Sequence, residues 1–408
     1  MAQFKFEAIK ALLTSKYWLI LTLSGAFFAF FALNRGGVVV FIKLSFVFLI
    51  FNALFGEYKL KRISIFYWIA CAICAYLLLE SVLFYPKQSH FKWMVNLVHM
   101  LGVVFAIHCL SQKRINFRET TLFLIILSLA VCWQFIAHHL FKMPYGTFTK
   151  SHHLSSFVVL TLPMVVYSFF VTRGWYKFIF ITVAIMDAEL LLQTGSRPAL
   201  IGIVLATLFV FIFLTRGRNR WYGMTMIFII FAMCYITEYA NMAPKIKELI
   251  INLPKEERVQ IYSQAWNELK ENSLKEWIFG HGIRRFTVIY TPDSFLKPTH
   301  LVFPHFYFLE IFYLNGIIGV VLIFGGLAVL FASIVNAARQ NQNRKISLLL
   351  KCLIIVFLSW LFHCGLTFPF YSKYSLYPLS FILGVLLILL KRNYPHDKEE
   401  KIIEEISF

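Results

Sequence analysis

Three side chains in polar segments of this sequence have the chemistry needed to move a group off a phosphate leaving group. Arg197 and Arg258 are permanent cations, which can bind a diphosphate and stabilise the negative charge that it gains in the transition state. His305 can accept a proton from an attacking hydroxyl near neutral pH. Pro198 directly after Arg197 predicts a helix start, whose positive end would add to an anion site.

Each of these side chains also has a purely structural interpretation. Arg197 is suited to anchoring in lipid headgroups, and His305 is suited to a place at the membrane interface. Arg258 follows Glu256 and Glu257, either of which is a candidate ion-pair partner. The chemistry therefore depends on whether the three groups converge, which residue types alone do not decide.

Composition makes this chain an integral membrane protein. It has 408 residues, of which 59% are hydrophobic and only 14% charged, whereas a soluble domain carries about 25% charged residues. The formal net charge of +19 would suit nucleic acid if it formed a patch. The basic residues instead separate apolar runs, as in membrane proteins with a basic cytoplasmic side, so we expect no nucleic-acid partner.

The expected fold is all-α, a polytopic membrane protein with about 12 transmembrane helices and one large outer loop. Residues 1–237 contain the first nine spans, 238–315 the outer loop with an interfacial helix, 316–390 the last three spans, and 391–408 a charged cytoplasmic tail. The predicted spans are 17–33, 38–55, 63–84, 93–110, 121–140, 154–172, 176–192, 198–214, 223–239, 316–337, 348–366 and 376–390.

Lysine and arginine are concentrated in alternate connections, which sets the orientation. Segments such as the one with Lys59, Lys61 and Arg62 are predicted to be cytoplasmic, and the connections between them hold scattered single charges. Both termini are therefore expected in the cytoplasm, and the first span stays as an anchor because no cleavage site follows it. This topology places Arg197 and the loop 238–315 on the outer side.

The outer loop is predicted to contain a helix, and a segment of glycines and arginines is predicted to follow its end. Arg258, Tyr262, Ala265, Trp266 and Leu269 recur at helical spacing after a proline start signal. Gly280 and Gly282, followed by Arg284 and Arg285, break the pattern. The short apolar run 306–314 after Pro304 is predicted to be an interfacial helix rather than a crossing.

Ionisable residues inside the spans share one predicted depth, the outer half of the bilayer. They are Lys43, Glu80, His99, Asp187, Glu189 and His363. One interpretation is a polar cavity that opens outward; the other is helix packing, in which Lys43 pairs with Glu80 and the acids of 187–189 pair with an arginine.

No metal or redox site is expected. The pair Cys71 and Cys74 lies in an apolar run, which does not favour a reactive thiolate. The histidines at 138, 139, 152 and 153 lack evident carboxylate or thiolate co-ligands, so we interpret them as residues of a solvated outer loop.

Four segments give the chain a resemblance to a known family. TGSRPALIG (194–202), ERVQIYSQAW (257–266), WIFGHGIRRF (277–286) and PHFYFLEIFYLNGIIG (304–319) occur in this order. The set resembles the O-antigen ligase and polymerase superfamily, bacterial inner-membrane enzymes that transfer glycans from a polyprenyl diphosphate carrier. Two positions depart from the family pattern: Pro198 stands where a small residue is common, and Phe306 where asparagine is frequent.

The resemblance implies an inverting glycosyltransferase that needs neither metal nor cofactor. Arg197 and Arg258 would bind the diphosphate, and His305 would activate the acceptor hydroxyl. The outer loop would lie in the periplasm with the active site, and both termini in the cytoplasm of the inner membrane. Substrate contacts are expected from Lys43, Tyr262, Trp266, His281, Arg284, Arg285 and Glu310.

Within this superfamily the layout favours a ligase. Polymerases tend to have two sizeable outer loops, and protein-directed members a longer C-terminal region than the one here. The expected partners are an undecaprenyl-diphosphate-linked glycan donor, a lipid A core acceptor and membrane lipids. The alternatives are an O-antigen polymerase or protein O-oligosaccharyltransferase, and a lipid-linked sugar transporter, which would need an inward-facing polar path that the sequence does not display.

Overall fold

The structure is a computed structural model. It describes residues 65–84, 91–112, 117–148, 150–172, 174–215, 257–282, 288–290, 300–302, 306–368 and 372–392, with short pieces among 21–50 and single residues at 217, 221 and 370. The predicted first, second and ninth spans lie wholly or mostly outside the described residues. So do His305, Arg284, Arg285 and the predicted tail.

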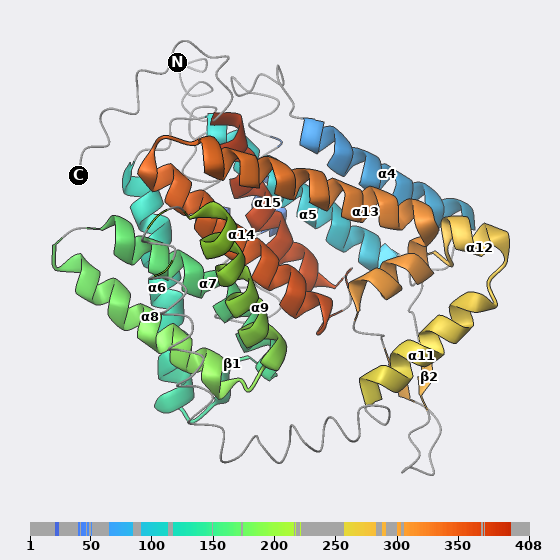
Figure 1. Cartoon of the computed structure of the whole chain (residues 1–408), viewed down its shortest axis with the longest axis horizontal. Helices are drawn as coiled ribbons and strands as arrows, with labels where there is room; N and C mark the ends of the chain where they lie inside the picture. Colours follow the sequence, from blue (N-terminus) through green and yellow to red (C-terminus); the bar gives the residue numbers. More distant parts are fainter. Residues whose placement is uncertain are drawn as a thin grey trace, which may run out of the picture.

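The described chain is mostly helical (Figure 1). Its helices are α4 (Ile65–Phe84), α5 (Phe91–Gln112), α6 (Phe117–His139), α7 (Ser151–Val171), α8 (Tyr176–Gln193), α9 (Arg197–Phe209) with a π-helical end (Val210–Leu214), α11 (Glu257–Lys270), α12 (Leu274–Phe279), α13 (Tyr307–Gln340), α14 (Arg344–Gly365) and α15 (Lys373–Arg392). Its strands are β1 (Pro144–Thr147), β2 (Val288–Tyr290) and β3 (His300–Val302).

Four of the described helices are long and apolar enough to cross a membrane, judged by length and composition. They are Ser151–Val171, Arg197–Leu214, Tyr307–Gln340 and Arg344–Gly365. Shorter apolar helices lie within α4, α5, α6 and α15. The structure therefore agrees with a helical membrane protein, while the number of crossings and their direction remain predictions from the sequence.

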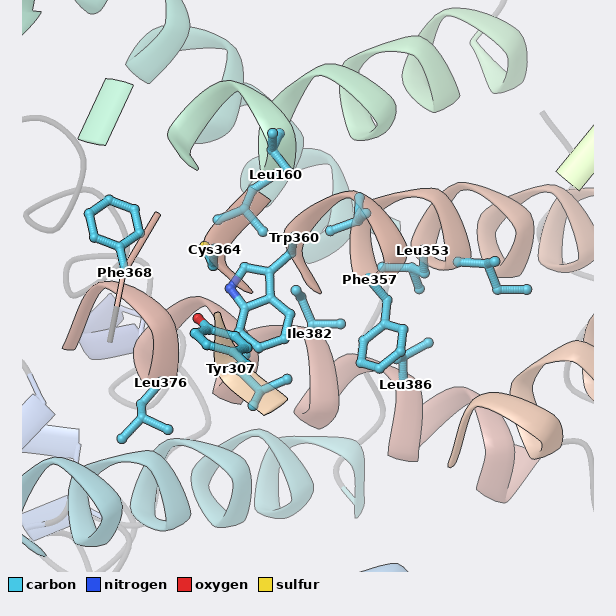
Figure 2. Packing of buried hydrophobic residues seen from close by; sticks show 14 of the residues in the cluster. Leu160, Tyr307, Leu353, Phe357, Trp360, Cys364, Phe368, Leu376, Ile382 and Leu386 are labelled. Atoms are coloured by element: carbon cyan, nitrogen blue, oxygen red, sulfur yellow. The ribbon is translucent and has the colours of Figure 1, made fainter. Parts of the chain in front are cut away.

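Helix α14 is central to the bundle and packs against α7, α9, α13 and α15. Its Phe357 and Trp360 are among the largest fully buried side chains. Figure 2 shows the indole nitrogen of Trp360, the hydroxyl of Tyr307 and the sulfur of Cys364 pointing toward one another inside this core. The interior therefore combines apolar packing with a few polar groups near one end of α14.

Gly202 allows α9 to approach α14 closely. A Cβ atom at this position would lie 3.1 Å from the carbonyl oxygen of Ser359 and 3.3 Å from Cβ of Phe362. Contacts this short require a neighbour to move, and the first one is a backbone atom. The last glycine of the TGSRPALIG segment thus has a packing role.

Helix α13 consists of two helices separated at Gly316. This residue has φ 60° and ψ −165°, a non-helical conformation that favours glycine and marks a kink between the two parts. The first part, Tyr307 to Asn315, is the short helix predicted from the run 306–314. Its side chains are largely buried: Leu309 and Leu314 are among those inside the protein.

The described residues of 238–315, the predicted outer loop, form α11, α12 and the strand pair β2–β3 in addition to the short helix. Helix α11 buries Ile261, Ala265 and Leu269, a spacing of four residues that defines one helix face. Helix α12 begins with a capping box between Ser273 and Glu276 and ends at a glycine with positive φ. Strands β2 and β3 pair antiparallel beside α11.

Candidate functional site

Polar contacts join the ends of helices that are far apart in sequence. The His363 ring at the end of α14 lies 3.1 Å from the Ser155 hydroxyl at the start of α7. The His99 ring early in α5 lies 3.0 Å from the Tyr377 hydroxyl early in α15. A His139 ring nitrogen and a Glu189 carboxylate oxygen, at the ends of α6 and α8, lie 3.0 Å apart. These contacts bring together the helix ends that the sequence assigns to the outer side.

Arg197 is the first residue of α9, and its side chain is exposed. Ser196 occupies the N-cap position without making a side-chain cap bond, and Pro198 stands in the first turn. The N–H groups of this first turn therefore have no side-chain cap, and the helix dipole adds a partial positive charge to that of the guanidinium. The predicted helix start beside Arg197 is confirmed, and this end of α9 is suited to an anion.

Arg258 is the second residue of α11. One turn later, the Tyr262 ring lies 5.8 Å from the ring of Phe306, the residue that follows His305. Trp266, one more turn along, is 44% exposed. In the view of Figure 1 the first residues of α9 and of α11 lie on the same, lower side of the molecule. Helix α11 is thus packed beside the start of the short helix.

The FGHG turn (279–282) docks on the break in α13. The backbone N–H groups of His281 and Gly282 donate to the carbonyl oxygens of Tyr313 and Leu314 at 3.0 and 2.8 Å. These carbonyls are at the C-terminal end of the short helix, just before the non-helical Gly316, where carbonyl groups commonly accept from groups outside the helix. A Cβ atom at Gly280 would overlap the Leu314 backbone, so two segments of the family resemblance meet at this close contact.

His281, predicted to contact substrate, supports this turn. Its ring nitrogens lie 2.9 Å from the Asn272 side-chain oxygen and 3.5 Å from a Glu276 carboxylate oxygen. The ring also stacks on Tyr313, with centroids 4.3 Å apart. These contacts give His281 a structural role between α12 and the short helix.

Glu276 is held as a carboxylate by the cap of α12. The Ser273 backbone N–H and the Ser273 hydroxyl each donate to it at 2.8 Å. These hydrogen bonds, the backbone one foremost, lower the pKa of Glu276 below its ordinary value. Burial instead raises the pKa of Glu268 on the preceding helix.

Glu80 binds to the break in α13. Its carboxylate accepts from the Asn315 amide at 2.8 Å, and the Tyr76 hydroxyl donates to the Asn315 carbonyl at 3.1 Å. The suggested pairing of Glu80 with Lys43 is therefore replaced by a bond to an amide on another helix. Lys43 is exposed and lies close enough to His99 to act on it electrostatically.

Glu310, also predicted to contact substrate, is 1% exposed. Both of its carboxylate oxygens lie within 3.1 Å of the Phe370 backbone nitrogen, which donates to them. The Tyr307 hydroxyl, one turn earlier, donates to Ser375 at 2.6 Å. Glu310 thus fastens the short helix to the connection between α14 and α15, and Tyr307 fastens it to the first turn of α15.

The remaining buried acid, Asp187, accepts from Thr161 at 2.6 Å. Asp187 and His363 have no exposed surface, and Glu80 is 2% exposed. Asp187 and His363 bind different residues of α7, Thr161 and Ser155, and Glu80 binds Asn315 of α13. These side chains take part in helix packing, so the described residues favour that interpretation over a single cavity lined by all of them.

Within the described part of the chain, no group of three His, Cys, Asp or Glu side chains is placed to hold a metal ion. His139 pairs with Glu189, and a His138 ring nitrogen lies 3.2 Å from the Met143 carbonyl oxygen. Cys71 and Cys74 are not joined to each other. The histidines near the α6–α7 connection are thus engaged in local contacts.

The sequence did not indicate Asn315, Tyr307 or the close approach of Gly280 and Gly316, where a Cβ atom at Gly316 would lie 2.7 Å from the Gly280 nitrogen. The glycines themselves are visible in the sequence as FGHG and NG. Which segments they contact is not, because the two motifs are far apart in the chain. Whether Arg197, Arg258 and His305 converge lies beyond the described side chains. No model of a known protein family matches this chain and no curated protein matches it, so the family resemblance stays a prediction from the motifs.

Proposed function

We propose that this chain is an inverting, metal-independent glycosyltransferase of the O-antigen ligase type. It transfers O-antigen or a related glycan from undecaprenyl diphosphate to a lipid A core sugar at the periplasmic face of the inner membrane. The observation that supports the proposal is the docking of the FGHG turn on the break in α13. Two segments recognised separately in the sequence are thereby parts of one contact.

In the proposed mechanism the donor lipid lies between spans and its diphosphate binds Arg197 and Arg258. His305 removes the proton from an acceptor hydroxyl as the oxygen attacks the anomeric carbon. The bond from that carbon to the diphosphate oxygen breaks, and the two arginines stabilise the charge left on the diphosphate. Attack opposite to the leaving group inverts the anomeric configuration.

The uncapped start of α9 supports the role given to Arg197. An anion there interacts with the guanidinium and with the N–H groups of the first helical turn. The position of Tyr262 against Phe306 supports a common location for α11 and the His305 segment. Both observations concern described residues adjacent in sequence to the proposed catalytic groups.

The test is transfer by the purified full-length chain in detergent with EDTA, from a lipid-linked donor to lipid A core. We expect product with the wild-type chain, and a loss of about a hundredfold to ten-thousandfold with Arg197→Ala or His305→Ala, the range expected from removing a catalytic group. His138→Ala is a matched control, because His138 contacts a loop carbonyl at the end of α6. A fully active His305→Ala variant would show that another group is the base.

The acceptor separates the candidate reactions. Lipid A core supports the ligase, repeat-unit extension of the donor would support a polymerase, and modification of a protein would support an oligosaccharyltransferase. Absence of any product, combined with movement of donor across reconstituted vesicles, would favour a transporter and overturn the enzymatic proposal.

A further inference from the structure

The outward face of α11 combines one large aromatic side chain with groups that form hydrogen bonds. Ser263, Trp266, Asn267 and Lys270 are all exposed. Their spacing of i, i+3, i+4 and i+7 places them on one side of a helix. The opposite side, with Ile261 and its neighbours at intervals of four residues, is buried, so the exposed face is not needed to pack α11 onto the protein.

The composition of this face argues against contact with lipid tails. A lipid-facing surface is apolar, because an amide or ammonium group in hydrocarbon costs several kcal/mol or must reach the interface. Here a hydroxyl, an amide and an ammonium group surround the Trp266 indole. The exposed side chains on this face therefore suit a polar ligand that also has an apolar surface.

The face continues toward the start of the short helix. Tyr262 lies beside Trp266 on α11, and its ring is 5.8 Å from that of Phe306. Phe306 and Phe308, with ring centroids 6.4 Å apart, are 41% and 44% exposed. Aromatic side chains thus extend from the middle of α11 to the residue after His305.

From this arrangement we propose that Ser263, Trp266, Asn267 and Lys270 form a subsite for the saccharide of the acceptor. A pyranose ring presents C–H groups on its faces, which stack on an indole, and hydroxyl groups at its edge, which bind hydroxyl and amide side chains. Lys270 adds a positive charge, which complements a saccharide with carboxylate or phosphate groups. The inference rests on the proposed function and names the site where the acceptor binds.

The acceptor suits this site better than the donor. In the proposed mechanism the donor is already held by its lipid and its diphosphate. The acceptor must be oriented through its sugars, which requires a surface of this kind near the base. Tyr262 and Phe306 connect the subsite to the segment that contains His305.

The test measures binding without transfer. The full-length chain in detergent is titrated with core oligosaccharide released from lipid A, and the dissociation constant is followed by calorimetry. Trp266→Ala should raise this constant about tenfold or more, because a large aromatic contact is lost. Trp266→Phe should restore most of the affinity, and Asn267→Ala or Asn267→Leu should each weaken binding about fivefold.

Trp175→Ala is the matched control. Trp175 is 62% exposed at the start of α8, on the predicted cytoplasmic side. Its replacement should leave oligosaccharide binding unchanged. A second series measures KM for acceptor and for lipid-linked donor, in which Trp266→Ala should raise the acceptor value alone.

Unchanged oligosaccharide binding by Trp266→Ala would overturn this inference. So would a rise in the donor KM instead of the acceptor KM, or full retention of binding by Asn267→Leu, which would indicate a lipid contact. Failure of the proposed function would look different, since the wild-type chain would then transfer no glycan in the separate assay.

Discussion

Replacing Gly280 by alanine is expected to separate the FGHG turn from α13 and to destabilise the chain by about 2–6 kcal/mol. Gly280 has φ 75° and ψ −165°, a backbone conformation that is essentially restricted to glycine and costs an L-residue about 1–3 kcal/mol. The added Cβ would also overlap the Leu314 carbonyl group and the Asn315 nitrogen. Because these are backbone atoms that cannot rotate away, the overlap adds about 1–3 kcal/mol.

The control for this prediction is Gly174→Ala. Gly174 has φ 68°, but a Cβ atom there would meet nothing within 4 Å. This variant therefore incurs a cost of positive φ without the steric one. The contact of the turn with α13 is expected to make the loss of stability clearly larger in Gly280→Ala than in Gly174→Ala.

Stability is measured by denaturant unfolding of the detergent-solubilised chain, together with hydrogen exchange of the peptide 272–282. Gly280→Ala should lose several-fold protection in that peptide and should reduce glycan transfer, because α12 no longer packs on the short helix. Equal losses of stability in the two glycine variants, or unchanged exchange in Gly280→Ala, would refute the close contact.

Two further predictions concern the same junction. Asn315→Ala should destabilise the chain by about 1–3 kcal/mol, because the buried carboxylate of Glu80 loses its donor. Glu80→Gln retains an acceptor oxygen and should lose less stability. A larger loss of stability in Glu80→Gln than in Asn315→Ala, measured by denaturant unfolding, would contradict the assignment. The α12 cap should weaken in acid: the pKa of Glu276 is lowered in the folded chain, so its stabilisation is complete above its ordinary pKa of 4.5 and is lost as pH falls through the lower folded value. Exchange rates of α12 should therefore rise below about pH 4.5, and Glu276→Gln should remove that pH dependence.

The sequence determined much of the helical organisation. Apolar runs of sufficient length required helices, because a backbone in lipid must satisfy its own hydrogen bonds. Nine of the predicted spans coincide with described helices, α4 to α9 and α13 to α15. Pro198 and the run before Gly316 also located the start of α9 and the separate short helix. These are local signals, in which each residue acts on its immediate neighbours.

The partners of the polar residues were decided by the tertiary structure. Depth along a span is readable from sequence, but the direction of a side chain around the helix axis and the identity of the facing helix are not. Glu80 therefore binds Asn315 rather than Lys43, and Glu310, predicted to contact substrate, binds the Phe370 backbone. Buried polar groups must find hydrogen-bond partners wherever packing brings them close, and that packing joins segments more than 200 residues apart in the case of Glu80 and Asn315.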